Sequence, residues 1–287
     1  EVYQVFLAAL EVMAYSAVEK NGIIQIVPDT SARAMGLPLA GSLAAANNPV
    51  PLMVSNLSAW WDGNDPSGTG VKPSDGTLIS TWVDKSGNGN NGVQTNPTRY
   101  TPFSANGFAT GKGTLLFDVT NALFLAPDNN SLDLSTGDFS LFAVHKPLAV
   151  SDIWHWFYEK GDGSNTILDY SFGIDISGVM RLSVGNNFKD DLFGDTTIEV
   201  DTAYIHADVF NLTGSNNKMY QGNTIINDES IIAGDVNTED LYIGNKLGQE
   251  QGYVGYIAGL LIYKKALNDN ERNTIMRYLS QKWGVSL

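Results

Sequence analysis

The three histidines do not occur in any catalytic or metal-binding pattern. His145, His155 and His206 are not accompanied by a G-x-S-x-G nucleophile motif or by an H-E-x-x-H zinc motif. The chain has no cysteine, which excludes cysteine nucleophiles, disulfides and zinc-thiolate sites. We interpret His145 as a strand-end residue that faces solvent or the rim of the fold, and strand alternation predicts that His206 shares a face with Tyr204 and Asp208.

The glycine- and asparagine-rich segment WVDKSGNGNNG, residues 82–92, does not have the form of a phosphate-binding loop. It lacks the terminal Lys-Ser/Thr pair and a following helix, both of which a phosphate cradle requires. We expect Trp82 to pack in a core and Asp84 and Ser86 to hold the turn. The Gly/Asn run then supplies backbone conformations that other residues resist.

Loops dense in Asp and Asn predict a calcium site, because Ca²⁺ takes six to eight oxygen ligands from carboxylates, amides and carbonyls. No EF-hand loop is present. The expected cofactor is therefore Ca²⁺ in a site of another kind. The first-ranked ligands are Asp62, Asp65, Asp84 and Asp118.

An exposed aromatic patch is predicted in the segment IWHWFY, residues 153–158, because it is too aromatic for both faces to be core. Aromatic rings stack on sugar faces, and amides bind sugar hydroxyls. The predicted ligand-binding residues are Trp154, Trp156 and Tyr158, with Asn186 and Asn187 in nearby turns. Further candidates of the same kinds are Tyr220, Tyr253 and Asn245.

The composition limits the classes of partner that this 287-residue chain is expected to bind. Its 31 acidic and 17 basic residues give a net charge of −14, which repels nucleic-acid backbones and anionic lipids. Neutral glycans and divalent cations remain compatible. No window of 18 uncharged apolar residues predicts a membrane span.

Residues 52–265 consist of short β-rich runs between Gly, Asn and Asp turns. Met180, Leu182 and Val184 alternate with Val179, Arg181 and Ser183, as in antiparallel strands with one buried face. A strand spacing of roughly 8 to 15 residues is typical of a sandwich or jelly roll.

The chain ends in a predicted helix. Asn268 and Glu271 form a capping-box pattern, and Ile275, Leu279 and Trp283 fall on one face of a helix that ends near Gly284.

Residues 1–40 have a different pattern, a helix followed by a β-hairpin. EVYQVFLAALEVM has helical apolar spacing, and a Lys20-Asn21-Gly22 turn joins two strands, of which the second stops at Pro28. The motifs EVYQVFL, GIIQIVPD and ARAMGLPL resemble the second half of the N0-like domain of type II secretion secretins. Half of such a domain leaves an apolar helix face, which we expect to dock on the rest of the chain, on a partner or on residues outside this sequence. Residues 41–51, GSLAAANNPVP, have the composition of a linker.

The remaining chain, residues 52–287, resembles LamG-like jelly-roll domains of the concanavalin A-like lectin/glucanase superfamily. The resemblance rests on LSAWWDGND, WVDKSGNGNNGVQ, LLFDVTNALFLAP, FSLFAVHKP and YVGYIAGLLIYKKALNDNERNTIMRYLSQKWG, in the family's order. It implies a two-sheet antiparallel β-sandwich, carbohydrate or protein ligands, and often a calcium ion. The family's usual F-D-G pattern is Phe117-Asp118-Val119 here, so the glycine is missing.

Enzymes of the same superfamily resemble one another in an E-x-D-x-x-E strand. In this chain Glu199 and Asp201 are followed by Tyr204 in place of the third acid. Glycoside hydrolysis needs two carboxylates in separate roles, so we expect an acid pair on an exposed strand or in a turn, and no enzyme.

The leading hypothesis is a non-catalytic carbohydrate- or ligand-binding adhesion module of an extracellular, cell-envelope or virion protein. The alternative is a structural subunit of a filament, pilus or capsid surface that assembles through residues 1–40. A glycoside hydrolase or polysaccharide lyase is the third and least favoured hypothesis.

Overall fold

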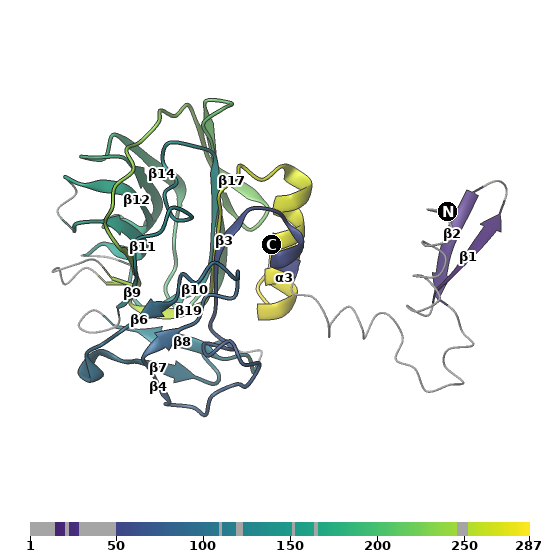
Figure 1. Ribbon diagram of the computed structural model, residues 1–287, viewed down its shortest axis with the longest axis horizontal. Coiled ribbons are helices and arrows are strands. Elements are labelled where there is room, and N and C mark those ends of the chain that lie inside the picture. Colours follow the sequence, from purple (N-terminus) through teal and green to yellow (C-terminus); the bar gives the residue numbers. More distant parts are fainter. Residues whose placement is uncertain are drawn as a thin grey trace. The chain divides into compact units, whose positions relative to one another are not determined.

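The computed structural model describes residues 15–20, 23–28, 50–108, 111–118, 123–150, 153–163, 166–245 and 252–287. The chain divides into two compact units, Glu1–Met53 and Val54–Leu287. In the first unit β1 (Tyr15–Lys20) and β2 (Ile23–Pro28) form the predicted antiparallel hairpin (Figure 1). The helix predicted before it lies outside the described residues, and assembly through residues 1–40 stays a prediction. A 3-10 turn, η2 (Val50–Met53), follows.

The second unit is a sandwich of two antiparallel sheets (Figure 1). In the part that the structure describes, the first sheet has nine strands. In spatial order they are β17 (Thr224–Glu229), β16 (Asn216–Gln221), β15 (Tyr204–Asn211), β10 (Phe139–Pro147), β19 (Gly255–Tyr263), β8 (Thr114–Phe117), β7 (Thr101–Ser104) and β4 (Leu78–Ile79), with β3 (Leu57–Asp62) also paired to β19.

Eight strands form the second sheet over the same described ranges. Their spatial order is β14 (Asp190–Thr197), β13 (Val179–Val184), β12 (Leu168–Ile174), β11 (His155–Gly161), β18 (Leu241–Ile243), β9 (Phe124–Ala126), β6 (Gly92–Val93) and β5 (Thr81–Trp82). A 3-10 turn, η3 (Pro97–Arg99), lies between β6 and β7 in the chain. The predicted fold class, a mainly β two-sheet sandwich with a C-terminal helix, is confirmed.

Large aromatic side chains fill the space between the sheets. Phe139 and Phe210 stack with ring centroids 4.6 Å apart, and Trp82 lies 5.8 Å from Phe124, centroid to centroid. Each such ring buries a large apolar area, which is the main favourable term for a fold of this size.

The C-terminal helix α3 (Asp269–Trp283) lies against the nine-stranded sheet, on the side away from the other sheet (Figure 1). The Asn268 side chain caps the helix and Glu271 completes the predicted capping box. The buried face includes Ile275 and Trp283, and Gly284 ends the helix at φ 66°. The N-cap, the capping box, the buried apolar face and the terminal glycine confirm the helix that the sequence predicts.

The loop of residues 82–92 is held by one carboxylate. Asp84 Oδ1 accepts the backbone N–H groups of Trp60 at 2.9 Å and Ser86 at 2.8 Å, while Oδ2 accepts the Ser86 hydroxyl and the Asn90 N–H. Gly87 and Gly89 have φ of 92° and 80°, a region that side chains disfavour. The predicted structural role of this loop is confirmed.

A chain of hydrogen bonds lies buried inside the sandwich. His145 Nδ1 lies 3.0 Å from the Tyr253 hydroxyl, His145 Nε2 lies 2.7 Å from His206 Nδ1, and His206 Nε2 lies 3.2 Å from Gln221 Oε1. The expectation that His145 faces solvent or the rim was wrong, because these partners satisfy both of its nitrogens in the interior. Burial keeps both imidazoles neutral, and since Gln221 Oε1 only accepts, His206 Nε2 donates to it, His145 Nε2 donates to His206 Nδ1, and the Tyr253 hydroxyl donates to His145 Nδ1. Burial is the main cause that lowers both pKa values, to about 4 for His206.

Asp208 lies on the same inward face of β15 as His206, as strand alternation predicts. Burial raises the pKa of Asp208 to about 8, although a 3.2 Å hydrogen bond from Asn217 Nδ2 opposes the shift. The buried carboxyl is therefore protonated at neutral pH.

The pKa of Asp208 predicts that Asp208→Asn gains stability relative to the wild type as pH rises. The folded protein retains this proton up to about pH 8, whereas the unfolded chain releases it near the ordinary Asp pKa of 3.8. The wild type thus loses up to about 1.4 kcal/mol per pH unit through this group as pH rises from about 4 to 8. The variant has no such proton. Urea denaturation of both proteins at pH 4, 6 and 8 measures the difference, and a difference independent of pH would contradict the assignment.

Candidate functional site

One row of side chains on the eight-stranded sheet points away from the sandwich core. The inward row across β12, β13 and β14 contains Phe172, Leu182 and Leu192, which are all part of the core. The neighbouring row contains Gly173, Arg181 and Phe193 in register. Because alternate residues of a strand face opposite sides, this second row faces outward.

A bulge in β11 brings a tryptophan into the outward row. Trp156 pairs with Gly173 and Tyr158 pairs with Phe172, so Phe157 is an extra residue in the strand. Trp156 therefore joins Gly173 and Arg181, whereas Tyr158 turns inward.

The structure corrects the expectation that Tyr158 is exposed. Its ring is fully buried, and its hydroxyl donates to the carbonyl oxygen of Phe142 at 2.7 Å. Simple alternation put Tyr158 on the face of Trp156, and the bulge reverses that. Tyr220, Tyr253 and Asn245 are also buried, so their surroundings are protein.

Arg181 is the centre of the outward row. Its Nε donates to Asp191 Oδ1 at 2.5 Å and its Nη2 donates to Asp191 Oδ2 at 2.6 Å, which is a bidentate pair between neighbouring strands. The Ser183 hydroxyl also donates to Asp191, at 2.7 Å. This geometry fixes the plane of the guanidinium.

Four aromatic rings surround the guanidinium of Arg181. Its Cζ lies 4.2 Å from the ring centroid of Trp154, 4.4 Å from Phe188, 5.3 Å from Phe193 and 5.6 Å from Trp156. Trp154 and Trp156 are parallel within 2°, with centroids 5.5 Å apart. Cation–π attraction strengthens when the cation is desolvated, and Arg181 is only 3% exposed. We call these four rings and Arg181 the aromatic face.

Solvent reaches part of the aromatic face. Trp156 is buried, Trp154 and Phe188 are half-buried, and Phe193 is 41% exposed. The predicted exposure holds in part at Trp154, whereas the expectation that Trp156 is exposed was wrong, because its ring is buried beside Trp154 and Arg181.

The two predicted asparagines lie in the turn between β13 and β14. Asn186 Oδ1 accepts the backbone N–H of Leu168 at 2.9 Å, so this side chain helps to hold the turn. Asn187 is exposed, with φ 56°, and precedes Phe188, with φ 54°. Two successive left-handed residues set the position of Phe188 beside Arg181.

Sequence reasoning missed Arg181, Asp191, Phe188 and Phe193 as parts of the site. A signal was available, because Arg181 lies on the polar face of an alternating strand, and Asp191 and Phe193 flank the apolar Leu192 in the same way. Their meeting depends on the register of β13 and β14, which the irregular turn sets.

Two of the four predicted calcium ligands are paired with lysines. Lys85 Nζ lies 3.2 Å from Asp62 Oδ2 and 2.8 Å from Asp65 Oδ2, and Lys282 Nζ lies 2.6 Å from Asp62 Oδ2. Burial opposes ionisation of Asp62, but the charges of Lys282 and Lys85 outweigh it and lower its pKa. The two ammonium groups supply the positive charge that a metal ion would supply. The ion pair of Lys282 with Asp62 also joins α3 to β3.

The other two predicted ligands lie elsewhere in loops. Both Asp84 oxygens accept hydrogen bonds from the loop of residues 82–92, and Asp118 is exposed at the end of β8. Among the described residues, no three His, Asp or Glu side chains are grouped to hold a metal ion. Calcium binding stays a prediction.

Glu199 and Asp201 lie in the turn between β14 and β15, not on a strand. Asp201 has φ 59° and forms an ion pair with Lys146 at 2.7 Å. The interpretation of these acids as a turn pair is confirmed.

No family model matches the chain, and no curated protein matches it. The LamG-like and secretin resemblances therefore remain interpretations of sequence motifs.

Solved structures share the fold. The binding domain of Paraclostridial mosquitocidal protein 1 superposes with a TM-score of 0.59 at 15% identity, over 83% of this chain and 56% of that chain. Domain 4 of AbnA, an extracellular arabinanase of Geobacillus stearothermophilus, was solved in complex with arabinotriose. It superposes with a TM-score of 0.54 at 13% identity, over 77% of this chain and 98% of that chain. A Trypanosoma rangeli sialidase in complex with the inhibitor DANA superposes with a TM-score of 0.52 at 12% identity, over 95% of this chain and 43% of that chain.

These similarities establish a common β-sandwich. The chain spans only about half of the length of the first and third of these structures. In the described part of the chain, no helix is long and apolar enough to cross a membrane.

Replacing Arg181 by lysine should destabilise the protein by about 2 kcal/mol, since lysine keeps the charge but loses the bidentate pair and the planar contact with the rings. Urea denaturation measures the change. The control is Lys189→Ala. Lys189 Nζ lies 3.7 Å from Asp235 Oδ2, and both side chains are 41% exposed, so the free energy of unfolding should change by no more than about 0.5 kcal/mol. Equal effects of the two substitutions would contradict a central role for Arg181.

Proposed function

We propose that residues 54–287 form a non-catalytic carbohydrate-binding module whose ligand contacts the aromatic face. The observation that carries the proposal is the partly exposed ring of Trp154, held in place by Trp156 and by Arg181, which the exposed ring of Phe193 also contacts. Fixed apolar rings suit the apolar faces of sugars, and they lose little conformational entropy on binding.

Polar groups at the edge of the rings support the same ligand class. Asp191 has a side chain 28% exposed, and Asn187 is exposed in the adjacent turn. A carboxylate accepts hydrogen bonds from sugar hydroxyls, and an amide both donates and accepts. The net charge of −14 favours neutral sugars at this face.

The fold similarities are compatible with the proposal. The arabinanase domain is a β-sandwich solved in complex with arabinotriose, and the mosquitocidal-protein fragment is a binding domain. A module of this kind would work on an extracellular, envelope or virion protein, which is the setting that we propose with it.

Trp154→Ala is expected to weaken glycan binding at least tenfold, or about 1.4 kcal/mol, because truncating an aromatic anchor removes the stacking surface. The measurement is a glycan array that includes arabinotriose, followed by calorimetry on the strongest glycan. Tyr100→Ala, which alters a half-buried tyrosine next to η3, is the matched control and should bind like the wild type.

Each array is run with calcium chloride and with EDTA, which also tests the expected calcium ion. Absence of binding to every glycan in both conditions would contradict the proposal, and so would undiminished binding by a folded Trp154→Ala variant.

A further inference from the structure

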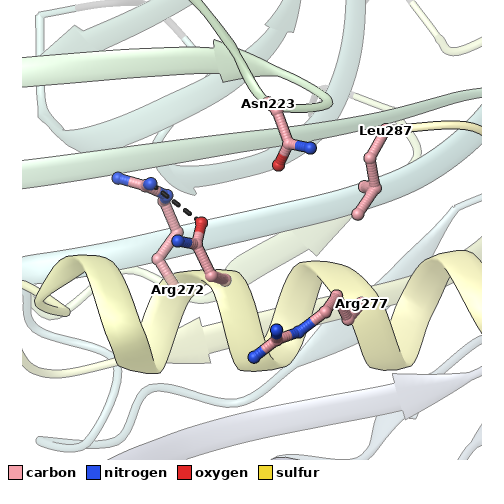
Figure 2. A pocket seen from close by; sticks show the side chains of 5 residues that line it. Asn223, Arg272, Arg277 and Leu287 are labelled. Carbon is pink, nitrogen blue, oxygen red and sulfur yellow. Dashed lines mark hydrogen bonds between the residues drawn. The ribbon is translucent and has the colours of Figure 1, made fainter.

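A hollow of about 330 Å³ lies between helix α3 and the β16–β17 turn (Figure 2). It is lined by Arg272, Asn273 and Arg277 of α3, by Asn223 of the turn and by Leu287. Its volume is within the range of small-ligand sites. Figure 2 shows Asn223 and Leu287 facing the helix that carries both arginines.

Arg272 is held in one position by its neighbours. Its Nη1 donates to the Tyr220 hydroxyl at 2.6 Å and to Asp269 at 2.7 Å, and its Nη2 donates to Asn273 Oδ1 at 2.9 Å. The guanidinium also lies 4.0 Å from the Tyr220 ring centroid. Arg272 is thus a rigid part of the wall, and Asp269 offsets its charge.

Arg277 differs from Arg272 in its surroundings. It lies about 1.4 helical turns further along α3 and is exposed. No hydrogen bond or ion pair joins it to another described residue. Its positive charge is therefore not offset within the described chain, in a protein whose net charge is −14.

Amide donors lie at the same hollow. The Asn273 side-chain oxygen accepts from Arg272, its Nδ2 is a further donor, and Asn223 is exposed at the turn. Arg277 lines the hollow together with these two asparagines, and guanidinium and amide N–H groups both donate to the oxygens of a carboxylate or sulfate, each of which accepts more than one hydrogen bond.

We propose that this hollow, the Arg277 pocket, binds a small ligand through an oxyanion, a carboxylate or sulfate such as acidic sugars carry. Arg277 supplies the charge, Asn223 and Asn273 supply neutral donors, and Leu287 supplies an apolar wall. The site is separate from the aromatic face, since it lies on the nine-stranded sheet and α3.

The test is NMR titration of the full chain with sodium glucuronate, sodium sulfate and glucose. Saturable shifts of the Asn223 and Asn273 side-chain amides are expected with glucuronate, and none with glucose. Sulfate distinguishes the source of recognition. Binding equal to that of glucuronate would mean that the oxyanion alone is recognised, and weaker binding would mean that the sugar ring adds contacts.

Arg277→Gln should weaken glucuronate binding at least tenfold, and glutamine at an exposed helix position keeps the fold. Arg99→Gln, an exposed arginine of η3, is the matched control, and Trp154→Ala should also leave this binding unchanged. No saturable shift with glucuronate, equal binding by Arg277→Gln, or equal loss with Arg99→Gln would overturn the proposal.

Discussion

Burial of one row of apolar side chains in the eight-stranded sheet is the constraint on which the rest of the structure depends. Once Phe172, Leu182 and Leu192 face the other sheet, the alternating residues Gly173, Arg181 and Phe193 must face outward. The outward row then collects the charged and aromatic side chains of the candidate site. The core thus determines both the fold and the placement of the aromatic face.

Polar groups buried inside the sandwich are tolerated because their hydrogen bonds form a consistent set. The hydrogen bonds that run from Tyr253 through His145 and His206 to Gln221 form between uncharged side chains. Asp208 is also uncharged, because its carboxyl is protonated. The buried carboxylate of Asp62 is paired with Lys85 and Lys282. Neutral or paired states avoid the cost of isolated buried charge.

Patterns that act over a few residues made much of the fold predictable. The capping box of α3 and the turn around Asp84 follow from side chains that bond to nearby backbone, and strand alternation in 179–184 gave the sandwich class. The candidate site was only partly predictable. Trp154 and Trp156 were found, but the bulge after Trp156 turned Tyr158 inward, and the left-handed pair Asn187 and Phe188 set a register that composition does not reveal. Long-range pairs such as Lys282 with Asp62 leave no local signal.

The central claim is that a sugar ring binds against the aromatic face. The most direct measurement is a crystal structure of the protein with the glycan that binds most strongly on the array. The account predicts a sugar ring in contact with Trp154 and beside Phe193, with hydroxyls directed to Asp191 or Asn187. A glycan bound at another surface, with the rings of the aromatic face free of ligand, would contradict it.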